Sequence, residues 1–428
     1  MQKVLIISYF FPPCNLTASQ RANNWAKELN NFGYFPIVIT RKWDHKIESS
    51  SDLGKPSFNQ KIDVIINNKC KIIYAPYRSS LKDRIFIKHP YFKFLRKLFT
   101  FLELFFQNFT IKVLPYNNIF KIARQTIIKE DIKKLIITGN PFPCFHFGFL
   151  LKNEFKNLKW IADYRDDWTT TELTSKKRGL SKILFKLDQK SERKWLSNAS
   201  LMTSVSNYYA NKISDYIKVE GVELLNGFDN EAETQTNKTL ITDKFIITYN
   251  GSLYNSQKIE PILEIIKELI KEYENKQEII LKFPGLAFDP SQENRVRKVF
   301  SGLENKVYIS KRIERKKVLK IQQESHLLLM ISHENIKGIP SSKLYEYIGL
   351  RKPILLYPSD NDIIENTLIR TKLGIIGNSK SEIKLKLKNL IDEFIKTKKI
   401  RIIGDENEIK SLSRLNQTQK LAKILDKL

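Results

Sequence analysis

The segment from His326 to Pro358 reads HLLLMISHENIKGIPSSKLYEYIGLRKPILLYP, and its pattern indicates the fold better than any other stretch of the chain. Two short, uninterrupted apolar runs flank a polar loop and a stretch with helical spacing that starts near Ser342. Continuous apolar runs are typical of strands that are buried on both faces, as in parallel sheets whose crossover connections are helices. The segment therefore predicts a strand, a helix and a second, parallel strand.

The same alternation of strand and helix continues along most of the chain. The runs with strand character are Val4–Ser8, Phe35–Thr40, Lys134–Gly139, Lys159–Tyr164, Leu201–Ser206, Val222–Gly227, Phe245–Tyr254, Glu278–Gly285, Asn305–Ser310, His326–Ser332 and Ile354–Tyr357. Helical patterns separate most of them, and the order strand–helix–strand is that of doubly wound α/β domains. The predicted fold class is α/β, with two Rossmann-like domains that face a cleft.

A polar stretch in the middle of the chain divides this pattern. Its sequence is DNEAETQTNKTLITD, from Asp229 to Asp243, and it reads as a linker. A length of 428 residues also favours two domains over one. We predict a first domain at residues 1–228, a linker at 229–243, a second domain at 244–405 and a terminal helix at 406–428.

Composition excludes several classes of protein. Three widely spaced cysteines do not suit a disulfide framework or a zinc site, and they fit a reducing compartment. The apolar run at the N-terminus stops at Pro12 and Pro13, so we expect a buried strand rather than a signal peptide. No apolar run is long enough to span a bilayer, which predicts a cytoplasmic protein that is soluble or peripheral to the membrane.

The formal charge of +27 allows three kinds of partner: nucleic acid, an anionic membrane, or an anionic substrate combined with a lysine-rich composition. No block of Lys and Arg resembles a nucleic-acid-binding arm, and the basic residues are spread through ordinary periodic segments. We therefore expect no nucleic-acid partner.

One segment, Leu81–Leu114, departs from the α/β pattern because aromatic residues alternate with basic ones. An apolar helical stripe contains Phe94, Leu98, Phe101, Leu102 and Phe105, and the interleaved cations are Lys88, Lys93, Arg96, Lys97 and Lys112. One interpretation is a helical hairpin that packs on the first domain. The other is an amphipathic surface that docks on anionic lipid.

The helix predicted after His326–Ser332 carries candidate ligand-binding residues. A helix that begins beyond the carboxyl end of a parallel strand offers unpaired N–H groups to a phosphate. Ser341 and Ser342 lie at this helix start, and Lys343 and Glu346 share one side of it. The alternative is a surface Lys–Glu pair without function.

A second candidate phosphate-binding turn between a strand and a helix follows the strand that ends near Asn250. Gly251 allows a close approach of the backbone to a ligand, and Ser252 follows it. Lys258 is predicted in the first turn of a helix that runs from about Lys258 to Glu274, where a cation is favourable only beside an anion.

In the first domain, the segment KWIADYRDDW (Lys159–Trp168) has four charged residues at the end of an apolar strand. They are Asp163, Arg165, Asp166 and Asp167. These residues form either a structural Arg–Asp pair or an active-site cluster at the cleft. Arg21, on the helix after the first strand, is expected to face the same cleft.

Metal binding has little support in the sequence. The triplet Asp360-Asn361-Asp362 has the spacing of a metal–diphosphate motif but lies in a turn-rich loop, and the five histidines show no ligand spacing. We predict no metal site.

Taken in order, these motifs resemble family 4 of the retaining glycosyltransferases, which have the GT-B fold. The similarity covers essentially the whole chain and rests on ISYFFPP, TGNP, IADYRDDW, LLNGFD, ITYNGSLY, VYISKRI, PSSKLYEYIGLRKPIL and SRLNQTQKLAKIL. Gly338 stands where many members have a second glutamate, and Ser252 where many have an arginine.

The resemblance implies that the second domain binds a nucleotide diphosphate sugar and that no metal or other cofactor is needed. It also implies that the terminal helix at 406–428 crosses back and packs on the first domain. Glu346 would bind the ribose hydroxyls, Ile313 would lie near the base, and the diphosphate would contact the remaining donor residues. These are Gly251, Ser252, Lys258, Ser341, Ser342 and Lys343.

The resemblance also implies an acceptor on the first domain. Arg21 and Asn140 are expected on the acceptor side, and Asp163, Arg165 and Asp166 are the candidate catalytic residues. The predicted acceptor is an envelope polysaccharide or a lipid-linked glycan at the inner membrane face. The alternatives are a GT-B sugar-nucleotide epimerase or hydrolase, and a basic polyanion-binding protein without enzyme activity.

Overall fold

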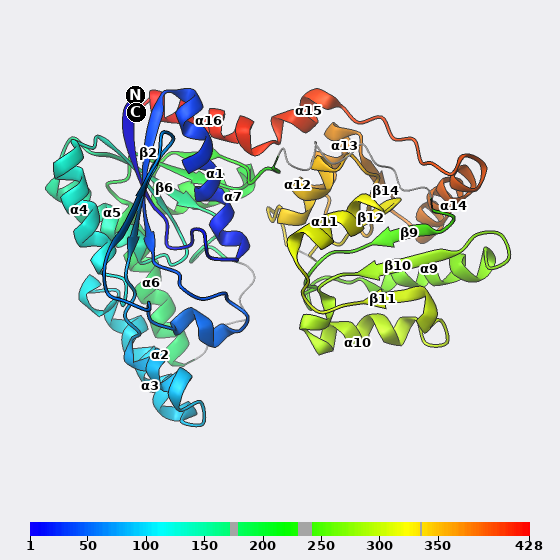
Figure 1. Ribbon diagram of the computed structural model, residues 1–428, viewed down its shortest axis with the longest axis horizontal. Coiled ribbons are helices and arrows are strands. Elements are labelled where there is room, and N and C mark those ends of the chain that lie inside the picture. The colour runs from blue at the N-terminus through cyan, green and yellow to red at the C-terminus, as the bar shows by residue number, and fades with distance from the viewer. Residues whose placement is uncertain (172–178, 230–241, 334–335) are drawn as a thin grey trace. The chain divides into compact units, whose positions relative to one another are not determined.

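The computed structural model describes residues 1–171, 179–229, 242–333 and 336–428. The chain forms two compact units, Met1–Leu225 with Thr418–Leu428, and Asn226–Gln417 (Figure 1). Most of the predicted linker at 229–243 lies outside the described residues. Each unit is built around one β-sheet.

The first unit contains an eight-stranded sheet in the order β3-β4-β2-β1-β5-β6-β7-β8. Its strands are β1 (Gln2–Ile7), β2 (Tyr34–Arg41), β3 (Asp63–Ile66), β4 (Lys71–Ala75), β5 (Lys134–Thr138), β6 (Lys159–Tyr164), β7 (Leu201–Ser204) and β8 (Gly221–Glu223). All neighbours pair in parallel except β3 and β4, which the sequence pattern did not indicate. The strand order reverses between β1 and β5, so the loops after these two strands diverge.

Helices cover both faces of this sheet (Figure 1). They are α1 (Gln20–Glu28), α2 (Leu81–Lys88), α3 (Lys93–Phe106), α4 (Asn118–Glu130), α5 (Cys144–Glu154), α6 (Leu180–Leu196), α7 (Asn207–Ile217) and the C-terminal α16 (Arg414–Asp426). Val4 and Ile6 of β1 are fully buried in a cluster that contains Trp25 of α1 and Leu421 of α16. The end of the chain therefore completes the core of the first unit.

The second unit contains a six-stranded, wholly parallel sheet in the order β11-β10-β9-β12-β13-β14. Its strands are β9 (Phe245–Thr248), β10 (Ile279–Phe283), β11 (Val307–Ile309), β12 (Leu327–Met330), β13 (Ile354–Leu356) and β14 (Gly374–Ile376). The predicted strand, helix and parallel strand within His326–Pro358 are β12, α12 and β13. Here the strand order reverses between β9 and β12.

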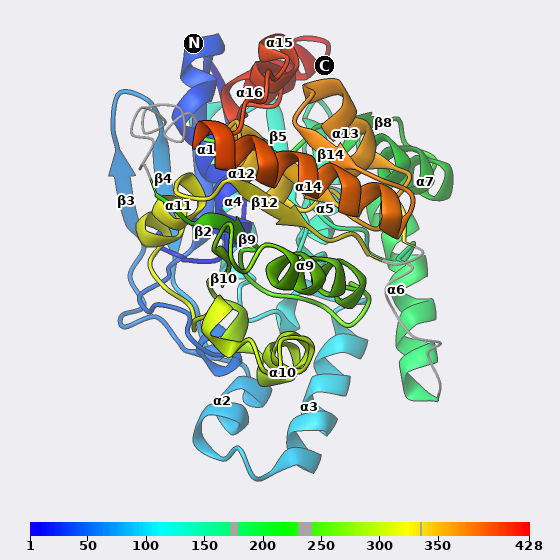
Figure 2. The same ribbon diagram turned by 90° about the vertical axis from the view of Figure 1, so that its right-hand side faces the viewer.

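Seven helices accompany this sheet within the described residues. They are α9 (Glu260–Glu272), α10 (Pro290–Val299), α11 (Arg315–Gln323), α12 (Ser342–Gly349), α13 (Ile363–Thr371), α14 (Lys380–Thr397) and α15 (Glu406–Ser411). Helices α9, α10 and α14 share one apolar cluster with β9, β10 and β12, and Figure 2 shows α9 and α14 side by side on that face of the sheet.

The predicted terminal helix at 406–428 is two helices in the structure, α15 and α16. The interruption lies at Leu412 and Ser413, where the backbone of Phe228 bonds to the chain. Phe228 N donates to Leu412 O at 3.1 Å, and Arg414 N donates to Phe228 O at 2.9 Å. Because these groups bond to a distant segment, they cannot continue the helical ladder.

Candidate functional site

The candidate site of the second unit lies where the strand order reverses, at the carboxyl ends of β9 and β12. Open α/β sheets bind ligands at such switch points because the diverging loops leave a crevice. The loop after β9 contains Gly251 and Ser252, and the helix that follows β12 and its loop carries Lys343. Lys343 Nζ donates to Ser252 O at 3.0 Å and to Tyr249 OH at 3.3 Å. The two turns predicted from sequence therefore meet.

Gly251 has the left-handed conformation that the turn requires, with φ +81°. Its N–H donates to Pro284 O at 2.8 Å, and the neighbouring Asn250 N donates to Tyr347 OH at 3.0 Å. A Cβ on Gly251 would come within 3.5 Å of Lys343 Cε and would be strained by the backbone angle. The turn thus presents bare backbone next to the Lys343 side chain.

The ammonium of Lys343 lies in a poorly solvated position. Burial lowers the pKa of Lys343 to about 8, against the opposing effect of Glu346. Among the described residues, no carboxylate forms an ion pair with Lys343, so the surface Lys–Glu pair is not what the structure contains. Within the described chain this half-buried cation contacts the hydroxyl and ring of Tyr249 and the carbonyl of Ser252, and such a cation is well placed to bind an anion.

The start of α12 has the expected capping arrangement. Ser341 is the N-cap, and its Oγ accepts from Lys343 N at 3.4 Å, whereas Ser342 is the first helical residue and is exposed. Leu344, Tyr347 and Ile348 are fully buried and form the inward face of the helix.

Glu346 pairs with a residue that the sequence interpretation missed. Its Oε2 lies 3.2 Å from Nη1 of Arg315, the first residue of α11. Arg315 Nη2 also lies 3.7 Å from Asp229. Ile313 is half-buried in the loop just before α11, two residues before Arg315.

The position predicted for Lys258 needs correction. Helix α9 begins at Glu260, with Pro261 in its first turn, so Lys258 lies on the preceding loop and is exposed. Proline suits the first turn because its missing N–H has no helical acceptor there. Lys258 is therefore outside the first turn of the helix.

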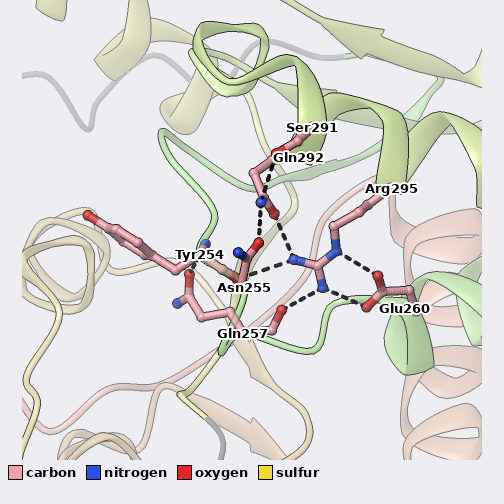
Figure 3. A network of polar contacts seen from close by, with 7 residues as sticks. All are labelled: Tyr254, Asn255, Gln257, Glu260, Ser291, Gln292 and Arg295. Carbon is pink, nitrogen blue, oxygen red and sulfur yellow. Dashed lines mark hydrogen bonds and ion pairs between the residues drawn. The ribbon is translucent and has the colours of Figure 1, made fainter. Parts of the chain in front are cut away.

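The loop between Gly251 and α9 is held by the network around Arg295 (Figure 3). The guanidinium forms a two-pronged ion pair with Glu260, at 2.7 Å and 2.8 Å. It also donates to the carbonyl oxygens of Tyr254 at 3.2 Å and Gln257 at 2.8 Å. Gln292 accepts from Arg295 at 2.7 Å. These bonds fix the backbone that leads away from the Gly251 turn.

His333, three residues beyond the end of β12, is a second residue that the sequence pattern did not reveal. Its Nδ1 lies 2.7 Å from Ser256 Oγ, and its ring lies 5.6 Å from that of Tyr254. Burial, and then the charge of Lys343, lower the pKa of His333. The available signal was its place directly after a predicted strand rather than any ligand spacing.

A pocket in the first unit occupies the corresponding switch point, after β1 and β5. The residues that line it are Ser8, Phe10, Ala18, Arg21, Thr138, Gly139, Asn140, Asp163 and Arg165. Four residues predicted from sequence, Arg21, Asn140, Asp163 and Arg165, therefore lie around one pocket.

Asp163 is fully buried and strongly bonded. Its Oδ1 accepts from Arg21 Nη2 at 2.7 Å and from Thr203 Oγ1 at 2.8 Å. Arg21 also donates to the backbone oxygens of Leu224 at 2.9 Å and Leu225 at 3.0 Å. This geometry favours the structural Arg–Asp pair, although the partner of Asp163 is Arg21 rather than its sequence neighbour Arg165.

The other acidic residues after β6 differ in environment. Asp166 is exposed and lies 3.0 Å from Arg165 Nη2. Burial raises the pKa of Asp167 to about 6. Asp166 therefore remains a candidate that a substrate can reach, whereas both carboxylate oxygens of Asp163 already accept from Arg21.

The Asp360-Asn361-Asp362 triplet has a structural role. The carboxylate of Asp360 accepts from Ile364 N at 2.9 Å and Glu365 N at 3.0 Å, and Asp362 accepts from Gly338 N at 2.5 Å. These bonds satisfy the first turn of α13 and hold the loop before α12. Across the part of the chain that the structure describes, no group of three His, Cys, Asp or Glu residues is arranged to hold a metal ion.

No protein-family profile matches the sequence, and no curated protein matches it either. Solved structures do match over the whole chain. Sucrose-phosphate synthase from Thermosynechococcus elongatus is 12% identical with a TM-score of 0.61, and the match covers 100% of this chain and 99% of that one.

Two ligand-bound structures are also similar. Anabaena HepE in complex with UDP and glucose is 11% identical with a TM-score of 0.59, over 100% of both chains. The UDP-forming α,α-trehalose-phosphate synthase from Burkholderia xenovorans, in complex with glucose-6-phosphate, is 8% identical with a TM-score of 0.62, over 99% of this chain and 100% of that one. These similarities show the GT-B fold and confirm the predicted fold class.

Proposed function

We propose that this protein is a glycosyltransferase that moves a sugar from a nucleotide diphosphate sugar to a glycan or lipid-linked acceptor. The observation that carries the proposal is the half-buried ammonium of Lys343 between the Gly251 turn and the start of α12. Preorganised cations and helix N–H groups stabilise the negative charge that a departing diphosphate develops. The ligands of the similar structures, UDP with glucose and glucose-6-phosphate, are consistent with this chemistry.

In this proposal each residue that binds the nucleotide diphosphate sugar has a distinct role. Lys343 and the backbone at Gly251, Ser252 and the α12 start contact the diphosphate, and Glu346 accepts hydrogen bonds from the ribose hydroxyls. Ile313 contacts the base, and Lys258 adds positive charge from its exposed loop. Transfer proceeds with retention and without a metal, as the resemblance to family 4 implies.

The first-unit pocket is the proposed acceptor site. Arg21, Asn140 and Arg165 line it, and Arg165 holds the exposed carboxylate of Asp166, which we propose orients an acceptor hydroxyl. We further propose that the acceptor is a cell-envelope glycan and that the protein works on the cytoplasmic side of the membrane.

A ligand screen on the full chain tests the donor class. UDP-, GDP-, ADP- and dTDP-sugars are compared by thermal shift, and at least one is expected to raise the melting temperature. If none does, the donor site is wrong. A product assay with donor alone separates the alternatives, since an epimerase or hydrolase converts the donor without acceptor. Steeply salt-dependent binding to a polyanion, with no donor bound, would instead indicate a basic binding protein.

Replacing Glu346 with glutamine is expected to weaken donor binding by ~1.5–3 kcal/mol, the scale of a hydrogen bond to a charged group. Isothermal titration with the donor found in the screen measures this loss. Arg315→Met is the matched control, because it removes the Arg315–Glu346 ion pair but keeps the carboxylate. Equal losses in both variants would show that Glu346 acts only through Arg315, and unchanged affinity in Glu346→Gln would remove it from the site.

A further inference from the structure

Helices α2 and α3 form a hairpin whose apolar surface is only partly covered. Within the described chain, neither helix contains a single buried residue. Figures 1 and 2 both show the hairpin at the end of the first unit opposite the chain termini. No described helix is long and apolar enough to cross a membrane.

The exposure is concentrated at the turn between the two helices. Tyr91 is 91% exposed, Phe94 is 78% exposed and Phe92 is 56% exposed. Farther along α3 the apolar stripe is partly covered, since Phe101 and Phe105 are half-buried with ring centroids 6.1 Å apart. The predicted stripe is thus packed at its C-terminal end and exposed at its N-terminal end.

The charges around this turn are almost all positive. Residues 81–114 contain seven Lys or Arg and two acidic residues. Both acids have partners: Glu103 lies 2.6 Å from Lys82, and Asp83 accepts from Tyr77 OH at 2.7 Å. Lys88, Lys93 and Lys97 are exposed, and no ion pair in the described chain involves them.

We propose that the turn from Lys88 to Leu98 docks the protein on an anionic bilayer, with Tyr91, Phe92 and Phe94 inserted at the interface. Aromatic side chains favour the headgroup region, and flanking lysines gain from the negative surface potential. A second copy of this chain fits less well, because a symmetric contact through this turn would bring like charges together. The inference adds a partner to the proposed function and does not depend on the donor site.

Sedimentation of the full chain with vesicles tests this proposal. Phosphatidylcholine vesicles are compared with vesicles that contain phosphatidylglycerol, at low and at high salt and without any nucleotide sugar. We expect binding to the anionic vesicles, weakened by salt because the Debye length shortens, and little binding to the neutral ones. Equal, negligible binding to both would overturn the proposal and leave the donor screen unaffected.

Two sets of variants locate the contact. Two multiple variants are each expected to lower binding to the anionic vesicles at least tenfold. One combines Tyr91→Ser with Phe94→Ser, and the other combines Lys88→Gln, Lys93→Gln and Lys97→Gln. The matched controls are Ile403→Ser, at an apolar side chain that is 87% exposed, and a triple Lys→Gln change at Lys271, Lys396 and Lys399, all exposed. The controls should bind like the unchanged chain.

Two results would contradict this assignment. If the controls and the hairpin variants lose binding equally, the attraction is one of net charge and not of this turn. If light scattering shows a dimer that the Tyr91→Ser and Phe94→Ser changes convert to a monomer, a second copy occupies the surface instead.

Discussion

Replacing Lys343 with methionine is expected to lower the affinity for a nucleotide diphosphate by roughly 10- to 150-fold, the range of one lost hydrogen bond to a charged group. Methionine keeps an unbranched apolar stem of similar length, so the half-buried position is still filled. What is lost is the ammonium, which lies 3.0 Å from Ser252 O beside the bare backbone of Gly251. Turnover should fall further than affinity, because charge on the diphosphate grows as the sugar departs.

The pH dependence provides an independent readout of the same residue. Burial lowers the pKa of Lys343 to about 8, so the unliganded site is mostly charged below pH 8 and mostly neutral above it. A diphosphate prefers the charged form, and affinity should therefore decline above about pH 8 in the unchanged chain. The decline should be absent in Lys343→Met.

The control for this prediction is Lys271→Met, which removes an exposed lysine of α9 and should leave affinity and its pH profile unchanged. Melting temperatures of both variants are compared, because Lys343→Met also removes the bonds to Tyr249 and Ser252. A Lys343→Met protein with unchanged nucleotide affinity would show that the diphosphate binds elsewhere.

The parts of the fold that could be predicted are those whose signal is local. β12 and β13 are continuous apolar runs, and the helix between them begins at the predicted Ser342. The meeting of Gly251 with Lys343 was also foreseeable, since both follow strands of one parallel sheet and such strands end at the same edge. Pro261 was a local signal for the start of α9 that the prediction did not use.

The remaining features depend on contacts between residues far apart in sequence. The break between α15 and α16 exists because Phe228 bonds to Leu412 and Arg414, which no helical pattern reveals. The partner of Asp163 proved to be Arg21, 142 positions away, although Arg165 is its near neighbour. Charge patterns indicate which residues can pair, but the sheet order decides which of them do.

Replacing Asp163 with alanine is expected to destabilise the first unit by about 3–5 kcal/mol, the cost of breaking a buried ion pair. Arg21 would keep the carbonyl oxygens of Leu224 and Leu225 but lose the carboxylate that lies 2.7 Å from its Nη2. All five tryptophans belong to the first unit, so urea unfolding followed by tryptophan fluorescence reports on this unit alone. Asp166→Ala, at an exposed carboxylate beyond the same strand, should leave the unfolding midpoint nearly unchanged.

This comparison also separates structural from catalytic roles among the predicted residues. If Asp163 acts by holding Arg21, the double variant Arg21→Met with Asp163→Ala should be less destabilised than the sum of the single variants, because both members of the ion pair are then removed. Activity of the Asp163→Ala protein should then fall together with its stability. If Asp166 is catalytic, the Asp166→Ala protein should lose activity but retain its stability. An Asp163→Ala protein that unfolds like the unchanged chain but is inactive would instead make Asp163 the catalytic carboxylate and leave the Arg21 contact secondary.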